Sequence, residues 1–376
     1  MITMSPTAAL RQRAAGLRRE GVEVFDFSAG ELDLPTPATI VSAAIDAVRR
    51  PENHHYGPTG GETHLRQAIA DRLSARTTTP LDDSNVLVTH GAKQALFNAF
   101  MALLSPGDEV LIPAPYWVTF PSSVRLAGGS PVIVQPSAGE LKVTPENLEA
   151  ARTPSTRAMV LCSPNNPTGL VYDTSELRAL LAWAAKHRVW IVSDETYVDL
   201  GFRPVPAPGR VEPGVSDRLV TVGSVSKSYA MTGWRVGWVA GPKKVIDAAA
   251  AVQSHTTSNV SRIAQAAAFA ALTGPDVTAE FRAILRSRLK VCQAALEPLG
   301  LFRTPPDGAF YVFPDVRRFA PDDVTVADRL LDSGVITVPG ASFGAPGHLR
   351  LSFAIAEEHL RRGLSAMAGL LDRWAG

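Results

Sequence analysis

Residues 224–238 read SVSKSYAMTGWRVGW, and this stretch is the most informative part of the 376-residue chain. Lys227 lies between two serines, and Arg235 follows further along, between two glycines. A lysine amine can condense with an aldehyde, and a guanidinium can hold a phosphate group. The stretch therefore indicates a site for a small molecule that carries both an aldehyde and a phosphate.

Short apolar segments alternate with helical segments on both sides of this stretch. The expected strands cover residues 86–89, 109–113, 158–162, 189–193, 219–223 and 236–240, and two expected helices cover residues 93–104 and 175–187. Strands that are buried on both faces read as short, continuously apolar runs, and strands that alternate with helices form parallel sheets. We therefore expect an α/β fold with a mostly parallel sheet flanked by helices.

The pattern changes near Gly274, and a smaller α+β domain is expected from the two ends of the chain. A long helix over 277–299 is followed by candidate strands at 308–313, 334–339 and 348–353 and by a final helix over 357–374. A first helix is expected over 8–20, and a turn-rich crossing follows it at 30–37. The expected division is an N-terminal arm and part of the small domain (1–35), a large domain (36–274) and the C-terminal small domain (275–376).

The overall composition excludes several classes of partner. The net charge is +1, from 37 basic and 36 acidic residues, so neither nucleic acid nor an anionic membrane is expected as a partner. The longest apolar runs are too short to span a bilayer, and the first residues do not resemble a signal peptide. A cytoplasmic location follows as an expectation. Two cysteines, Cys162 and Cys292, are too few for a zinc site by themselves, and no metal is expected.

Polar residues follow several of the expected strands. Asp194 and Ser224 come directly after apolar runs, and Asn166 lies in the turn SPNNPTG (163–169) after another. Gly91 and Ala92 open a helix after a fourth. Ligands of α/β sheets bind beyond the carboxyl ends of the strands, so these groups are expected to meet in one crevice.

The chemistry of pyridoxal 5′-phosphate (PLP) accounts for each residue type in this set. A buried Asp194 would keep the pyridine nitrogen protonated, while Asn166 and Tyr197 would donate hydrogen bonds to the phenolic oxygen. Lys227 is the natural base for moving a proton at the substrate Cα. The phosphate would bind at the helix start, next to a hydroxyl and a guanidinium; the expected residues are Gly91, Ala92, Ser224 and Arg235.

Nearly the whole chain resembles the fold-type I, class I aminotransferases. The resemblance rests on HYGPTGG (55–61), GAKQALFNAF (91–100), SPNNPTG (163–169), VSDETY (192–197), SVSKSYAMTGWRVGW (224–238), GAFYVF (308–313) and LRLSFA (349–354). It implies that Lys227 is the Schiff-base lysine and that Asp194 pairs with the pyridine nitrogen. It also implies that Trp117 stacks on the cofactor ring and that Lys93 belongs to the phosphate-binding helix start.

The resemblance further implies a homodimer with shared active sites. Tyr56 matches a tyrosine that reaches the phosphate from the partner subunit. Arg350 matches the arginine that grips the substrate α-carboxylate, and Gly30 and Asn166 match contacts near that carboxylate. The implied partners are therefore a second copy of the chain, an amino acid and a 2-oxo acid.

The choice of substrate rests on fewer residues. Ser5, Thr7 and Lys93 look like positions that a subgroup acting on aspartate or prephenate uses for the distal carboxylate. Alternatively, Ser5 and Thr7 cap the first helix and Lys93 is solvated. Arg262 stands where relatives have a small residue; it would read a second carboxylate if it points inward, and otherwise it is an interface or surface charge. Glu31 lies in Gly-Glu-Leu-Asp, where the family has Gly-Glu-Pro-Asp. The hinge at the crossing between the two expected domains therefore differs from that of the family.

The sequence as a whole predicts an aminotransferase with ping-pong kinetics. Another PLP reaction on the same scaffold stays open, such as a β-lyase, a decarboxylase, an oxidase or a biosynthetic transaminase with a non-acidic substrate. A PLP-binding regulator or a non-catalytic relative is the alternative from another class. A nucleotide-binding dehydrogenase would need a Gly-x-Gly-x-x-Gly motif after an early strand, and the sequence has none there.

Overall fold

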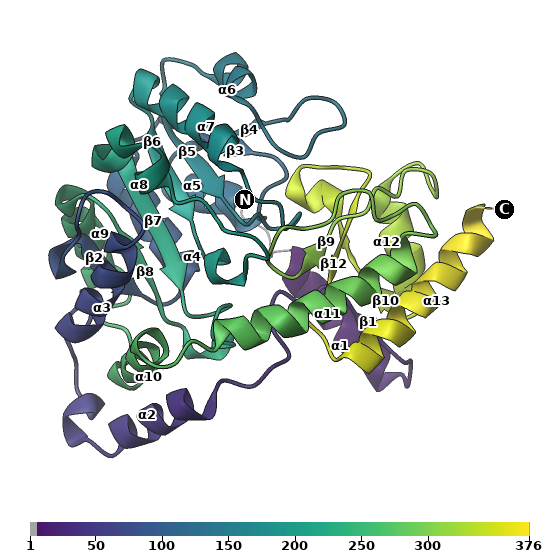
Figure 1. Ribbon diagram of the computed structural model, residues 1–376, viewed down its shortest axis with the longest axis horizontal. Helices are drawn as coiled ribbons and strands as arrows, with labels where there is room; N and C mark the ends of the chain where they lie inside the picture. Colours follow the sequence, from purple (N-terminus) through teal and green to yellow (C-terminus); the bar gives the residue numbers. More distant parts are fainter. Residues whose placement is uncertain (1–5, 376) are drawn as a thin grey trace.

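The structure is a computed structural model that describes residues 6–375, apart from the side chains of residues 6–9, 11 and 375. Figure 1 shows a large sheet with helices packed around it and, beside it, a smaller group of strands and helices. The long helix α11 (Thr278–Leu296) runs from the larger group to the smaller one (Figure 1).

The large sheet has seven strands in the order β2-β8-β7-β6-β5-β3-β4. Their bounds are β2 Val86–Thr89, β3 Glu109–Pro113, β4 Ser130–Val134, β5 Thr156–Cys162, β6 Trp190–Asp194, β7 Leu219–Ser224 and β8 Gly237–Ala240. Among these strands β8 runs antiparallel to both of its neighbours, and the other pairs are parallel. The predicted mostly parallel α/β sheet is therefore confirmed.

The remaining helices are placed between and around these strands. Their bounds are α1 Pro6–Arg19, α2 Ala38–Val48, α3 Thr63–Ser74, α4 Ala92–Leu103, α5 Thr119–Leu126, α6 Pro145–Ala151, α7 Thr174–His187, α8 Pro208–Val211, α9 Lys243–Thr256, α10 Arg262–Thr273, α12 Asp323–Asp332 and α13 Glu357–Ala375. The start of α7 shows why a helix begins where it does. The Asp173 carboxylate accepts hydrogen bonds from the backbone N–H groups of Ser175 and Glu176, both at 2.8 Å.

Alternate residues of the strands pack against opposite helical layers. In β3, Val110 and Ile112 join a buried cluster with α4, α5 and α9, whereas Leu111 joins a cluster with α7. Successive side chains of a strand point to opposite faces, so the continuously apolar strands of this sheet need helices on both. Full burial of each such side chain stabilises the fold by roughly 1.5–3 kcal/mol.

The two ends of the chain meet in the smaller group. β1 (Phe25–Asp26) pairs in parallel with β10 (Val335–Ile336), and three short strands form an antiparallel sheet in the order β11-β12-β9. Their bounds are β9 Tyr311–Val312, β11 Val338–Pro339 and β12 Leu349–Ser352. One buried cluster joins Phe25 and Phe27 to residues of α11, α12 and α13.

Two of the expected strands are shorter or divided. The strand expected over 334–339 is two strands, because the chain changes its pairing partner at Thr337, from β1 to β12. Only residues 311–312 of the expected strand 308–313 pair with β12. Gly308 instead forms an isolated bridge with Gly201, and a Cβ at Gly308 would lie 2.9 Å from the Gly201 Cα.

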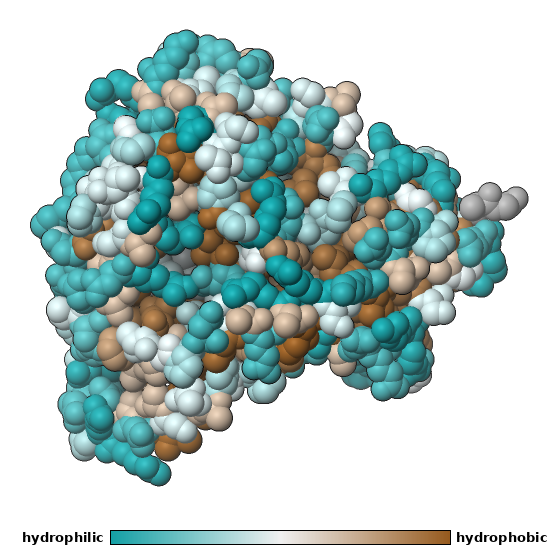
Figure 2. Space-filling model, in the orientation of Figure 1, coloured by the Kyte–Doolittle hydropathy of each residue, from teal (hydrophilic) through white to brown (hydrophobic). Residues whose placement is uncertain are grey.

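Hydrophilic residues predominate on the face shown in Figure 2, and hydrophobic groups show between them in separate patches. Among residues 6–375, no helix combines the length and the apolar character that crossing a membrane requires.

Candidate functional site

A cavity of about 400 Å³ opens at the carboxyl ends of the central parallel strands. It is lined by the last residues of three neighbouring strands, Cys162 of β5, Asp194 of β6 and Ser224 of β7. Most of the predicted site residues line this one cavity: Gly30, Ala92, Lys93, Trp117, Asn166, Asp194, Tyr197, Ser224, Lys227, Arg235 and Arg350. Segments that lie far apart in the sequence therefore meet where the strand-end argument placed them.

Two of the described residues that were predicted for the site, Gly91 and Tyr56, do not line the cavity. Gly91 lies directly behind it, as the residue before α4. Tyr56 is 89% exposed and projects from the surface of the chain. Ser5 lies outside the described residues, and Thr7 lies in α1 but its side chain is outside the described part.

The start of α4 and the guanidinium of Arg235 approach each other closely, and glycines make this possible. A Cβ at Gly91, whose φ is +81°, would lie 2.6 Å from the Arg235 Nη2 atom. A Cβ at Gly237 would lie 2.6 Å from the Gly91 carbonyl carbon. No side chain caps the start of α4, so its first N–H groups and the positive end of the helix dipole face the cavity together with the guanidinium. An anion such as a phosphate would be favoured next to these groups.

Asp194 and Lys227 line the same cavity from neighbouring elements. The Lys227 ammonium donates a hydrogen bond to the Gly30 carbonyl oxygen. Asp194 is 4% exposed and accepts a hydrogen bond from the Thr196 backbone N–H at 3.0 Å. Burial raises the pKa of Asp194, while the hydrogen bonds from Thr196 and the charge of Lys227 act in the opposite direction. Burial disfavours the charged form of a carboxylate, and a cation beside it stabilises that form.

A network of hydrogen bonds connects the other polar groups on the cavity wall. The Asn166 amide donates to the Tyr197 hydroxyl at 3.2 Å, and this hydroxyl lies 3.0 Å from that of Tyr311. Arg350 is 2% exposed and donates to Asn166 Oδ1 at 3.0 Å and to the Ser28 carbonyl oxygen at 2.8 Å. Burial, and then the neighbouring Tyr311, raise the pKa of Tyr197 well above its ordinary value. The tyrosine is therefore a neutral hydrogen-bond donor at physiological pH.

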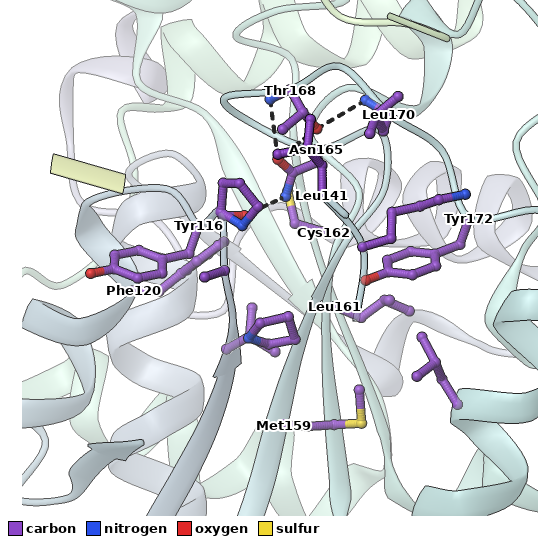
Figure 3. Close-up of a pocket in the computed structure, with 16 residues that line it drawn as sticks. Tyr116, Phe120, Leu141, Met159, Leu161, Cys162, Asn165, Thr168, Leu170 and Tyr172 are labelled. Carbon is purple, nitrogen blue, oxygen red and sulfur yellow. Dashed lines mark hydrogen bonds between the residues drawn. The ribbon is translucent and has the colours of Figure 1, made fainter. Parts of the chain in front are cut away.

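Asn165, which precedes Asn166, connects the loop of Asn166 to the loop of Trp117 (Figure 3). The Asn165 amide donates to the Pro115 carbonyl oxygen at 3.1 Å. Its Oδ1 atom accepts hydrogen bonds from the Thr168 N–H at 3.2 Å and from the Thr168 hydroxyl at 3.1 Å. A small cavity of about 20 Å³ lies among these side chains, next to the main one. Asn165 therefore connects the two loops that carry Asn166 and Trp117.

Lys93 and Trp117 lie side by side at the mouth of the cavity. Lys93 is exposed, and its Nζ atom lies 5.4 Å from the centroid of the Trp117 ring. Desolvation by the surrounding protein, although the side chain is exposed on one side, and then the charge of Arg235 lower the pKa of Lys93. Trp117 packs edge-to-face on Phe120, with 5.6 Å between the ring centroids.

The structure adds residues to which sequence reasoning gave no role in the site. Ser28, Glu31, Thr232 and Tyr311 line the cavity, and the Thr232 hydroxyl donates to the Glu31 carboxylate at 2.7 Å. The only sequence signal for Tyr311 was its place in GAFYVF, and Glu31 was read as part of a hinge. These residues come from segments that the strand-end argument does not cover.

Arg262 does not line the cavity. Its Nε atom lies 2.8 Å from the Glu62 carboxylate, and its Nη1 atom donates to the Glu52 carbonyl oxygen at 2.5 Å. The arginine therefore contacts the segment around Tyr56 rather than the site of its own chain.

Comparison with known proteins gives one consistent result. The family described as "Aminotransferase class I and II" matches residues 22–367. The aspartate aminotransferase of Streptomyces avermitilis is 44% identical over 99% of this chain and 95% of its own length. The aspartate/prephenate aminotransferase of Thermus thermophilus is 43% identical, over 98% of this chain and 96% of its own length.

Solved structures agree with the sequence relatives. The aspartate aminotransferase from Thermus thermophilus with maleate has a TM-score of 0.93 and 42% identity, covering 98% of this chain and 97% of that one. The aspartate aminotransferase from Rhizobium meliloti has a TM-score of 0.94 and 37% identity, covering 99% and 97%. The predicted family and the predicted fold type are thus confirmed. The chain belongs to the class I and II aminotransferases, enzymes that move an amino group from one carbon skeleton to another.

Proposed function

We propose that the chain uses PLP to transfer an amino group from an L-amino acid, aspartate or another acidic one, to a 2-oxo acid by a ping-pong mechanism. The observation that carries the proposal is that Lys227 and the buried Asp194 line one cavity together with Ser224 and Arg235. When bound, PLP supplies an aldehyde and a ring that accepts the electron pair released at the substrate Cα.

The residues of the cavity fit this cofactor. A volume of about 400 Å³ lies within the range of pockets that take small ligands. The phosphate would lie between the first N–H groups of α4, the Ser224 hydroxyl and the Arg235 guanidinium. Asp194 would hold the protonated pyridine nitrogen, because a buried carboxylate with a raised pKa gains most from a cation beside it. Trp117 would cover one face of the ring.

The remaining roles follow from the side chains on the wall. Lys227, once its amine is released, would be the base that moves a proton between the substrate Cα and the cofactor. Tyr197 and Asn166 would donate hydrogen bonds to the phenolic oxygen and keep it anionic. Arg350 would hold the substrate α-carboxylate, next to Gly30. Because its guanidinium is already fixed by Asn166 and Ser28, little side-chain freedom is lost on binding.

Absorption spectroscopy tests the cofactor and the lysine together. We expect the purified protein to absorb near the visible range with PLP, and borohydride to fix the cofactor covalently to Lys227. The Lys227→Ala variant should bind PLP without covalent fixation and should have no turnover. Full turnover in this variant would refute the proposed role. Product analysis with and without a 2-oxo acid separates transamination from a β-lyase or decarboxylase reaction.

The acidic substrate is supported by the relatives and by Lys93. Each relative compared above is described as acting on aspartate, or on aspartate and prephenate. Lys93 places a cation at the mouth of the cavity, where a distal carboxylate could reach it. Ser5 and Thr7 would add hydroxyl donors, but their side chains lie outside the described part of the chain.

Two variants separate the α-carboxylate from the distal carboxylate. Arg350→Ala should lower kcat/KM for all amino acids alike, whereas Lys93→Ala should lower it selectively for acidic substrates. A charged hydrogen bond is worth roughly 1.5–3 kcal/mol, so the loss for aspartate should be about tenfold or more. Equal losses for aspartate and a neutral amino acid in Lys93→Ala would contradict the acidic-substrate assignment.

We further propose a homodimer with shared sites. Tyr56 projects outward, and Ile45 and Val48 of α2, at 48% and 50%, are also exposed near it in sequence. Figure 2 shows hydrophobic groups at the lower edge of the molecule, where α2 lies in Figure 1. Exposed apolar side chains that gather on one face are typical of protein interfaces.

The division into a large domain over 36–274 and a small domain from 1–35 and 275–376 is part of the same proposal. It is supported by the buried cluster that joins Phe25 and Phe27 to the C-terminal helices. The expected cytoplasmic location stays a prediction.

A further inference from the structure

The segment that carries Tyr56 is held by contacts on both of its sides. It connects the short 3-10 helix Pro51–His54 to α3 and contains three glycines, at positions 57, 60 and 61. Glycine-rich backbone loses more conformational freedom on ordering than other backbone does, so a fixed position here needs specific anchors. The Thr59 carbonyl accepts a hydrogen bond from Gln253 at 2.9 Å, and the Gly60 carbonyl accepts one from the Val88 N–H at 2.9 Å.

These two anchors hold the part of the segment that follows Tyr56. The residues on either side of the tyrosine are held by a third contact. Arg262, the first residue of α10, reaches both flanks of Tyr56. It forms the ion pair with Glu62 at 2.8 Å and donates to the Glu52 carbonyl oxygen at 2.5 Å. One guanidinium thus connects residues four positions before and six positions after the tyrosine.

The stem of the arginine also lies directly beneath the backbone next to Tyr56. A Cβ at Gly57 would lie 3.2 Å from both Cγ and Cδ of Arg262, and 2.9 Å from the Glu62 Oε1 atom. The ion pair is only partly open to solvent, with side-chain exposures of 22% for Arg262 and 17% for Glu62. Partly buried ion pairs are screened less by solvent and salt than fully exposed ones, so the attraction between the two charges is stronger.

We infer that Arg262 is a positioning residue, which fixes the segment so that Tyr56 projects at the angle needed to reach the site of a second subunit. The inference rests on the proposed shared site, in which Tyr56 donates to the phosphate of the partner's PLP. Arg262 itself touches neither substrate nor cofactor. Its role is to hold the backbone that carries the exposed tyrosine in one position, so that binding does not have to order this segment.

The test is a double-mutant cycle measured on the dissociation constant of PLP from the full-length protein. Tyr56→Phe should raise this constant about tenfold, because a hydrogen bond to a charged phosphate is lost. Arg262→Ser should raise it roughly five- to tenfold, and the double variant should be little worse than Tyr56→Phe alone. Arg262→Lys should restore only part of the loss, because one ammonium cannot reproduce the fixed fork of a guanidinium.

Arg66→Ser is the matched control. Arg66 also pairs with a carboxylate, Asp83 at 2.8 Å, has the same side-chain exposure of 22%, and donates to the Asp83 carbonyl oxygen at 2.9 Å. It lies on α3 and contacts neither flank of Tyr56 through these bonds. Its removal should leave the affinity for PLP within about twofold of the parent.

The outcomes separate this inference from the function on which it rests. An unchanged PLP affinity in Tyr56→Phe would overturn the shared site itself. A clear loss in Tyr56→Phe with no loss in Arg262→Ser, or with losses that add fully in the double variant, would overturn the positioning role of Arg262. Sedimentation of Arg262→Ser as a monomer would also overturn it, because Arg262 would then hold the interface rather than the tyrosine.

Discussion

Asp194→Asn separates the charge of this residue from its shape. The amide oxygen of asparagine can still accept the Thr196 N–H that Asp194 accepts at 3.0 Å, so the fold around β6 should be retained. What is lost is a full negative charge on the cavity wall. A charge-assisted hydrogen bond to the pyridine nitrogen is worth roughly 1.5–3 kcal/mol. The affinity for PLP should therefore fall by about ten- to a hundredfold, and Cα proton removal should slow by several orders of magnitude.

The same substitution should stabilise the protein when PLP is absent. Burial is the largest cause acting on Asp194, and it raises the pKa of this group above 3.8. The folded protein then binds the proton more tightly than the unfolded chain does. Stability therefore falls as the pH rises from about 4 through the raised pKa, and the full penalty is present at neutral pH. Asparagine removes this penalty, so the gain in Tm should appear at pH 7 and vanish at pH values below the ordinary aspartate range.

Two measurements check the reasoning on Asp194. Stopped-flow absorption follows the half-reaction of the loaded protein with an amino acid, and thermal unfolding of the cofactor-free protein is followed between pH 3.5 and pH 8. Asp199→Asn is the control, because it removes a partly exposed carboxylate that pairs with Arg72 outside the cavity. A half-reaction at the parent rate would refute the electronic role of Asp194. A lower Tm at pH 7 without PLP would refute the electrostatic argument.

Three other substitutions test the packing and polar contacts. Gly237→Ala should lower both the PLP affinity and the Tm, because its Cβ would lie 2.6 Å from the Gly91 carbonyl carbon; an unchanged PLP affinity would show that the approach of α4 can relax. Phe100→Ala, in the buried layer between α4 and the sheet, should cost about 3–5 kcal/mol in denaturant unfolding, and a cost below about 1 kcal/mol would contradict the assigned core. Tyr197→Phe removes a hydroxyl that contacts Asn166 and Tyr311; kcat should fall with little change in Tm, and a parent-like kcat would argue against its role.

The sequence by itself determined the fold class and the polar groups that follow the central strands and line the cavity. The central strands of the large sheet read as continuously apolar runs, so their pattern specifies a buried parallel sheet, whereas the half-buried edge strand β4 gave no such signal. The strand-end rule then placed Asp194, Asn166 and Ser224 together, and all three line the cavity. These predictions succeeded because they depend on local periodicity and on the common direction of parallel strands.

Only the tertiary structure decided which distant segments complete the site. Tyr311 and Ser28 come from short strands and loops of the smaller group, where two-residue strands leave too weak a periodicity to place a side chain. Their contacts with Tyr197 and Arg350 depend on how this group packs on the sheet. Arg262 is similar, because its partners Glu52 and Glu62 are about two hundred residues away in the sequence. Such contacts are set by the packing of whole elements, and no local pattern encodes them.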